Sequence, residues 1–388
     1  MRTYSSDPLT SSGTRIRSLD GLRGWAACVV LLHHLIVYYL GFQAPSLLFD
    51  NARLQASWAE GDMFDLALTL VMRFFTSGHV AVCVFFVLSG YVLSFSQRDP
   101  SRRTLARATV SRYFRLMFPV LVVSLIAYAL MESGLLWNGV AATPPTKATF
   151  WLGKWYRFDS SLLDVLMKSL FDVFFKHESP LSYNPSFWTM SWELFGSLLI
   201  YAYFGIFKKD DAVQWRVLGG LLCVLVIIKP FLMCFIAGHI LYELKCLFDR
   251  KPHLQNNRPL NLGCILLFTV AAIVAGFSDR ELTDCLIAPF LVFPIVFSSS
   301  LSRLFTNKLS DFLGVISFPL YLIQVPIICS WSACLFVELP RLGWAQDTSV
   351  YLNLISTLIL CILASICLVP IETWTIKWSK KMGTLFLR

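Results

Sequence analysis

The sequence predicts an all-α protein, a polytopic bundle of about ten transmembrane helices. Composition gives the first support, because 56% of the 388 residues are hydrophobic and only 15% are charged. The mean hydropathy is +0.63, which is far too apolar for a soluble chain of this length. The second support is that apolar runs of spanning length recur along the chain, separated by short polar segments.

These apolar runs define the expected spans. They lie near 24–42, 78–97, 116–137, 187–206, 213–229, 230–247, 261–278, 285–302, 312–334 and 350–372. Two further stretches, around 63–76 and 147–176, are apolar but interrupted by charges. We therefore expect them to lie along the membrane interface rather than across the membrane.

The charges predict how the bundle is oriented. With the N-terminus in the cytosol, the expected cytosolic segments hold most of the 33 Lys and Arg residues, in agreement with the positive-inside rule. An even number of spans then places both termini in the cytosol. Residues 1–23 form a polar cytosolic segment, 24–378 one multi-pass membrane domain surrounded by lipid, and 379–388 a short basic cytosolic tail. The net charge of +9 is interpreted as a topology signal and not as evidence for nucleic acid.

Cysteine and histidine usage predicts no metal. Most of the eleven cysteines lie within expected spans, where they act as small hydrophobic residues, and they suggest no disulfide framework. No two of the six histidines have the i, i+3 or i, i+4 spacing of a helical metal site. His33 and His34 are adjacent, so their rings face different directions.

The first expected span carries the strongest functional signal. Arg23 and His34 are eleven residues apart, about 20° from three full helical turns, so both lie on one face. His34 is then roughly 16 Å further along the axis than Arg23. An ionisable group at that depth indicates a functional site. The structural alternative is a buried histidine hydrogen-bonded to a neighbouring helix.

Two further segments combine small or cationic residues with a span. Ser89 and Gly90 lie in an apolar run, where the favoured interpretation is a tight helix crossing. Six arginines occur between residues 98 and 115, and Arg112 and Arg115 share a helix face ahead of Pro119, where the helix can kink. Guanidinium groups bind phosphate oxygens bidentately, so a phosphate clamp and a topology signal explain these arginines equally well.

A carboxylate in the fourth expected span is the last candidate. Glu193 lies about two turns inside the span, where an unpaired charge costs several kcal/mol. A salt bridge to another helix and a functional role are both open interpretations. Trp188 and Trp192 are spaced i, i+4 and have the features of interfacial anchors.

Taken in order, these segments resemble the acyltransferase 3 family of integral-membrane O-acyltransferases, over about Ser18 to Trp378. Five motifs carry the resemblance, and their order along the chain makes it specific. The matching residues are Leu19 to Gly24 with Asp20, Arg23 and His34; Phe85, Phe86, Ser89, Gly90 and Tyr91; Arg112, Arg115 and Pro119; Trp188, Ser191 and Glu193; and Ser317 to Leu322.

The resemblance implies a donor and a division of roles. Acetyl-CoA is the expected co-substrate, entering from the cytosol, with its phosphates held by Arg112 and Arg115 and supported by Arg23. His34 is the expected general base on the acceptor hydroxyl. Glu193 is expected to act with His34 on the acceptor side, away from the CoA phosphates. The supporting residues are Asp20, Ser89, Trp188 and Ser191.

Departures from the family pattern bear on the acceptor. Many relatives carry a histidine where Gln324 stands, Ala81 replaces a customary glycine, and Trp192 is bulkier than the usual residue. The short loops resemble fungal members of natural-product pathways, which implies acetyl or short acyl transfer to a hydroxylated, lipophilic secondary metabolite such as a terpenoid or polyketide. The alternatives are an acyltransferase acting on a carbohydrate and a multipass transporter, although related halves typical of transporters are not evident.

Overall fold

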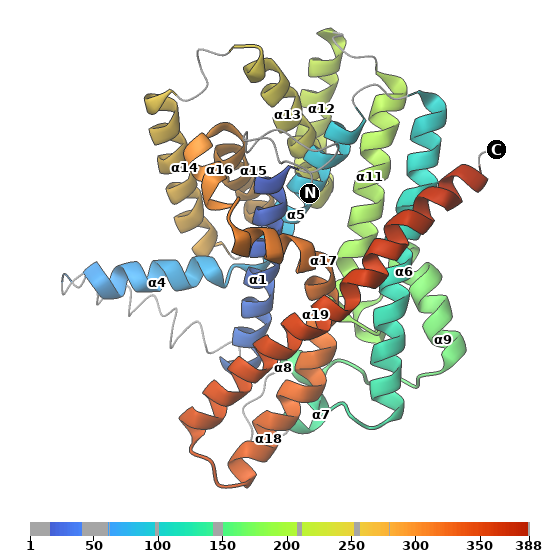
Figure 1. The fold of residues 1–388 in the computed structure, drawn as a ribbon, viewed down its shortest axis with the longest axis vertical. Coiled ribbons are helices and arrows are strands. Elements are labelled where there is room, and N and C mark those ends of the chain that lie inside the picture. Colours follow the sequence, from blue (N-terminus) through green and yellow to red (C-terminus); the bar gives the residue numbers. More distant parts are fainter. Residues whose placement is uncertain are drawn as a thin grey trace, which may run out of the picture.

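The computed structural model describes residues 16–40, 61, 63–97, 101–142, 150–207, 212–251, 257–278 and 280–386. The regular structure in these ranges is helical throughout, which confirms the all-α prediction (Figure 1). Residues 1–15 and 387–388, at the ends of the two expected cytosolic segments, lie outside the described residues, and so does Arg98 of the arginine-rich segment.

Long helices form the bundle and short helices connect them. The long ones are α1 (Arg17–Leu40), α4 (Met63–Phe75), α5 (Gly78–Ser96), α6 (Arg102–Glu132), α11 (Trp188–Ile206), α12 (Ala212–Ile228), α13 (Pro230–Asp249), α14 (Arg258–Gly276), α15 (Glu281–Phe297), α17 (Lys308–Ile327), α18 (Ala333–Arg341) and α19 (Gln346–Leu385). The short ones are α7 (Asn138–Ala141), α8 (Phe150–Gly153), α9 (Leu162–Met167), α10 (Val173–Phe175) and α16 (Ser299–Leu304).

Six helices in the described ranges are long and apolar enough to cross a membrane. They are α5, α6, α13, α14, α17 with its continuation to Arg341, and α19. The other expected spans coincide with α1, α11, α12 and α15, so each expected span overlaps a helix. A total of about ten spans, and the side of the membrane on which the termini lie, stay predictions.

The helices extend beyond the boundaries expected from the sequence. α1 begins at Arg17, inside the expected polar segment 1–23, and α19 continues to Leu385, inside the expected tail 379–388. In Figure 1, α19 crosses the bundle as one long diagonal rod. Polar residues at the end of an apolar helix can continue the same backbone hydrogen bonds, so hydropathy locates a span better than it locates the helix ends.

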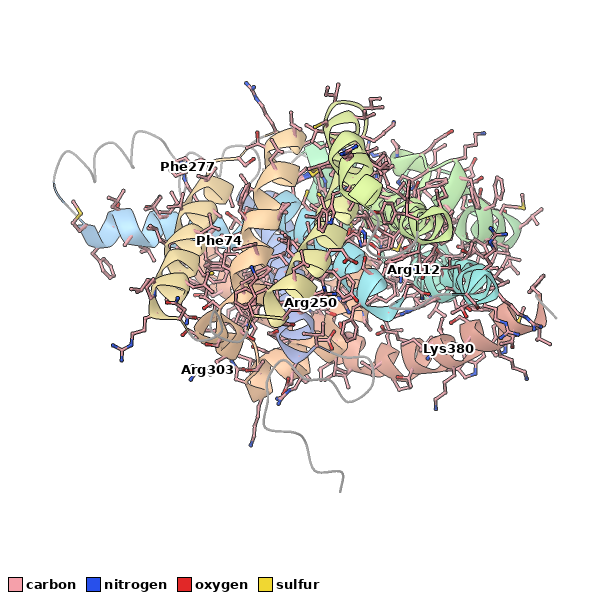
Figure 2. The ribbon with its side chains drawn as sticks, turned by 90° about the horizontal axis from the view of Figure 1, so that it is seen from above. Phe74, Arg112, Arg250, Phe277, Arg303 and Lys380 are labelled. Atoms are coloured by element: carbon pink, nitrogen blue, oxygen red, sulfur yellow. The ribbon has the colours of Figure 1, made fainter. Side chains whose placement is uncertain are left out.

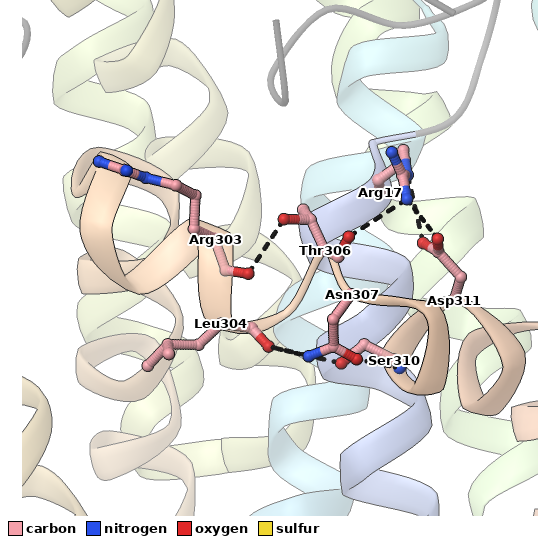
Figure 3. Close-up of polar contacts among 7 residues, drawn as sticks. All are labelled: Arg17, Arg303, Leu304, Thr306, Asn307, Ser310 and Asp311. Atoms are coloured by element: carbon pink, nitrogen blue, oxygen red, sulfur yellow. Dashed lines mark hydrogen bonds and ion pairs between the residues drawn. The ribbon is translucent and has the colours of Figure 1, made fainter. Parts of the chain in front are cut away.

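The start of α1 is fixed to the start of α17 (Figure 3). Arg17 forms an ion pair with Asp311 and also donates to the carbonyl of Thr306 at 3.2 Å. Asn307 caps α17, its side-chain oxygen accepting from the backbone N–H of Ser310 at 2.9 Å. These contacts join two segments almost 300 residues apart in the chain.

Glycines then allow α1 and α17 to approach closely. A Cβ on Gly24 would lie 2.4 Å from the carbonyl carbon of Leu313, and a Cβ on Gly314 would lie 2.7 Å from the carbonyl oxygen of Asp20. Because Gly21 meets Ser310 and Gly24 meets Leu313, the two helices run parallel. Small residues of this kind permit backbone contact between membrane helices.

A second close crossing joins α5 and α13. A Cβ on Gly90 would lie 2.1 Å from the carbonyl oxygen of Phe235, and one on Gly238 would lie 2.1 Å from that of Val87. The tight crossing predicted at Ser89 and Gly90 is confirmed. It brings α13 against the helix that carries Ser89 and His79.

We expect Gly90→Ala to destabilise the protein. The added methyl group would overlap backbone atoms of the neighbouring helix, which cannot move aside as a flexible side chain could. Overpacking of this kind costs about 1–3 kcal/mol. Gly263→Ala in α14 is the matched control, since its Cβ would meet nothing within 4 Å. Thermal unfolding of both variants in detergent tests this prediction, and equal melting temperatures would contradict it.

The two segments expected at the membrane interface present apolar side chains outward. α4 projects sideways from α1 in Figure 1 and exposes Met63, Phe64, Leu68 and Val71. Its other face is anchored by Phe74, which is labelled in Figure 2. The Phe74 ring contacts Phe268 of α14, with ring centroids 6.4 Å apart. In the second segment, Leu162, Leu163, Met167, Phe171 and Phe175 are exposed. An interfacial position for both segments stays a prediction.

Candidate active site

His34 lies in an enclosed setting made by three distant parts of the chain. Its imidazole stacks on the indole of Trp151 in α8, with centroids 5.4 Å apart and planes 23° apart. The side chain of Gln324 in α17 interacts with it from another side. The ring nitrogen Nδ1 is buried without a hydrogen-bond partner. Neither Trp151 nor Gln324 was singled out as a partner of His34 from the sequence.

His33 faces elsewhere, as its position next to His34 predicts. Its Nδ1 donates to the carbonyl of Thr76 at 2.6 Å, and its ring fills the space above Gly78. The ring also meets His79 edge-on at 6.2 Å. His33 therefore connects α1 to the turn between α4 and α5.

An aromatic row continues from His33 across the helices. The His79 ring lies 6.2 Å from Trp188, which lies 5.1 Å from Phe231, and Trp192 lies 5.4 Å from the same Phe231 ring. His79 belongs to this row, because its ring contacts both His33 and Trp188. The row joins residues of α5, α11 and α13, so no local spacing in the sequence could indicate it.

The predicted arginines gather between α1 and α6. Arg115 is exposed and has no hydrogen bond or ion pair with another described residue, although the charges of Arg112, Arg23 and Glu372 act on it. Arg23 lies beside Asp20, with 3.5 Å between Nη1 and the nearest carboxylate oxygen. Arg115 and Arg23 together form a cationic group at the opposite end of α1 from His34.

Arg112 occupies a different setting from Arg115. Its guanidinium is only 9% exposed and forms an ion pair with Glu193, which is 13% exposed (Figure 2). Its Nε also donates to Ser197 Oγ at 2.8 Å. The expectation that Glu193 lies away from the arginines is therefore wrong. The interhelical salt bridge, which the sequence left open, is the arrangement found.

Ser89 and Ser197 complete the surroundings of this carboxylate. Ser89 Oγ donates to Glu193 Oε1 at 2.6 Å, and Ser197 Oγ donates to the Glu193 backbone carbonyl at 2.6 Å. The cluster ties together α5, α6 and α11. Ser191 is half-buried two residues before Glu193 on α11.

A small pocket lies where α6, α17 and α19 meet, and these three helices supply its lining. Its wall includes Glu372, whose charge acts on Arg115, and Leu322, two residues before Gln324. The remainder of the lining is apolar, with Pro119, Phe318 and Leu368 among its residues.

Three cysteines meet where α5, α13 and α15 pack together. The sulfur atoms of Cys83, Cys234 and Cys285 lie within 4.8 Å of one another, and all three side chains are fully buried. The Cys83 and Cys285 sulfurs are 3.6 Å apart. The spacing of these cysteines along the chain does not indicate the cluster. The expectation that the protein binds no metal stays a prediction.

Comparisons with known proteins match this architecture to one family. A family model described as an acyltransferase domain matches residues 16–372. The chain is 23% identical over 371 residues to O-acetyltransferase PaAT-1 of Phomopsis amygdali, covering 80% of this chain and 71% of that protein. It is 24% identical over 411 residues to acyltransferase clz18 of Cochliobolus lunatus, covering 85% and 86% respectively. No solved structure matches the chain.

Proposed function

Because this chain belongs to the acyltransferase 3 family, we propose that it is a membrane-embedded O-acyltransferase using an acyl-CoA donor. It transfers an acetyl or short acyl group to a hydroxyl of a small lipophilic natural product. The observation that carries the proposal is the arrangement along α1. A cationic group with the exposed guanidinium of Arg115 stands at one end, and the imidazole of His34 stands near the other.

The donor phosphates bind at Arg115 and Arg23 in this proposal. Arg115 is exposed and has no hydrogen bond to another described residue, and its guanidinium offers the bidentate donors that phosphate oxygens prefer. Arg112 supports the site from within, through its ion pair with Glu193. The acyl-pantetheine arm then runs along α1, from this group toward His34.

His34 then acts as a general base in a direct transfer. Neutral imidazole removes the proton from the acceptor hydroxyl as its oxygen attacks the thioester carbonyl. The resulting tetrahedral intermediate collapses with cleavage of the carbon–sulfur bond, and the CoA thiolate leaves with the proton returned by the imidazolium. No described cysteine or serine is hydrogen-bonded to His34 Nδ1, which favours direct transfer over an acyl-enzyme.

The aromatic row favours a lipophilic acceptor. His79 meets His33 edge-on, and Trp188 and Phe231 continue the row away from it. Such surfaces bury apolar ring systems and leave few polar groups to be satisfied. The names of the two fungal relatives, an O-acetyltransferase and an acyltransferase, support acetyl transfer to oxygen here.

The test is purified protein incubated with acetyl-CoA and hydroxylated acceptors, read by mass spectrometry. The panel contains terpenoid and polyketide alcohols and, as a contrast, free sugars. We expect acetylated products from lipophilic alcohols together with release of CoA. Acetylation confined to sugars would reassign the acceptor, and no thioester consumption with any acceptor would contradict the proposal.

Arg115→Ala should raise the KM for acetyl-CoA several-fold and leave the acceptor KM nearly unchanged. A charge-assisted contact contributes about 1.5–3 kcal/mol, and Arg115→Lys should restore only part of it because lysine lacks the bidentate fork. Arg102→Ala is the control, since it removes an exposed arginine from the start of the same helix. Equal donor KM values in both alanine variants would leave Arg115 with a topological role alone.

A further inference from the structure

Two buried polar atoms beside the proposed base lack a hydrogen-bond partner. They are Nδ1 of His34 and Oε1 of Gln324, whose side chains interact without completing a hydrogen bond. Gln324 is fully buried. A buried polar group left unpaired costs about 1–3 kcal/mol, so two such groups side by side require an explanation.

The packing of α1 on α17 brings these two residues to the same level along the two helices. Gly24 lies against Gly314, and the two helices run parallel. Ten residues further along each helix, about 15 Å in both cases, come His34 and Gln324. The ion pair between Arg17 and Asp311 holds this register at the start of the helices.

The amide of Gln324 has a defined orientation. Its Nε2 donates to the backbone carbonyl of Tyr321 at 3.1 Å, so Oε1 is the end left for another partner. Tyr321 is held in turn, because its hydroxyl bonds to Thr189 Oγ1 at 3.0 Å and donates to the carbonyl of Ser186 at 3.2 Å. An acceptor fixed in this way suits a donor on the neighbouring helix.

The backbone around Gln324 is fixed as well. Pro326 has no N–H, so the carbonyl of Leu322, four residues earlier, loses its helical partner. Asn184 Nδ2 donates to this carbonyl at 2.5 Å, and Asn184 is fully buried. The segment that presents Gln324 is thus held by a specific contact from the loop before α11.

We propose that Gln324 is a positioning residue for His34, with Oε1 accepting a hydrogen bond from Nδ1–H. This bond holds the proton on Nδ1 and leaves Nε2 unprotonated, so Nε2 is the atom that receives the acceptor proton. Without a partner, a neutral imidazole divides between two tautomers and several ring orientations. The catalytic part of this inference rests on the proposed acyl transfer, whereas the tautomer is a property of the resting protein.

The tautomer is measured first, by NMR of the wild-type protein labelled with ¹⁵N at histidine, with His34→Asn used to assign the resonances. We expect His34 to show a protonated Nδ1 and an unprotonated Nε2, and Gln324→Met to show a mixture. Gln324→Met keeps the side-chain length and removes the acceptor. A wild-type His34 protonated on Nε2 would overturn the proposal, even if no variant could be purified.

Kinetics then separate positioning from folding. Gln324→Met should lower kcat about 10- to 100-fold with an unchanged acetyl-CoA KM, which is less than the 10²- to 10⁴-fold contribution of a general base. Gln324→Glu should retain most of kcat, because a carboxyl group can still accept from Nδ1–H. Equal losses in both variants, or wild-type kcat in Gln324→Met, would refute the positioning role. Absence of transfer in wild-type protein would instead refute the proposed function and leave the tautomer result standing.

Discussion

His34→Ala is expected to abolish acyl transfer while the protein remains folded in the membrane. A positioned general base contributes about 10²- to 10⁴-fold to the rate, and no other described side chain stands in the same place to replace it. The fold should survive, because the lost contacts are a stack on Trp151 and an incomplete hydrogen bond to Gln324. The measurement is product formation from acetyl-CoA by purified protein, normalised to the folded fraction seen in gel filtration.

His33→Ala is the matched control, one residue away on the same helix. It removes the hydrogen bond to the Thr76 carbonyl and the packing over Gly78, so a lower melting temperature is expected. Activity per folded molecule should stay within a few-fold of wild type. An inactive His33→Ala together with an active His34→Ala would show that the base has been assigned to the wrong histidine.

Features that depend on local spacing were predictable from the sequence. Helical periodicity places Arg23 and His34 on one face of α1, and the structure has both in a single helix, Arg17–Leu40. Gly90 within an apolar run predicted a close crossing, and Phe235 of α13 supplies the opposing backbone. Both inferences need only the geometry of one helix and the size of one side chain.

Features that depend on how helices pair were not predictable. Glu193 and Arg112 are about 80 residues apart, and hydropathy does not state which face of α11 meets α6. For the same reason, the contact of His79 with Trp188 and that of Gln324 with His34 could not be predicted from the sequence. Many arrangements of the helices in a bundle bury the same apolar area, so the hydrophobic pattern of the sequence cannot choose among them. Specific polar pairs between helices distinguish one arrangement from the rest.

The Arg112–Glu193 pair makes the second large prediction, because breaking a buried ion pair leaves the remaining charge without compensation. Loss of one partner of such a pair costs about 3–5 kcal/mol. Glu193→Gln keeps the side-chain volume and can still accept hydrogen bonds from Ser89 and Arg112. The free energy of unfolding that it loses should therefore fall toward the lower end of that range. Arg112→Gln should cost more, because it leaves a carboxylate held only by Ser89.

The double variant Arg112→Gln with Glu193→Gln separates a structural pair from a catalytic carboxylate. If the pair is structural, removing both charges should restore much of the melting temperature lost in Arg112→Gln, and activity per folded molecule should stay near normal. Glu338→Gln breaks the exposed pair with Arg341 and provides the control, with an expected change of about 0–1 kcal/mol. If Glu193→Gln instead melts like wild type, binds a CoA analogue normally and makes no product, Glu193 acts on the acceptor. The ion pair with Arg112 would then serve to hold that carboxylate in place.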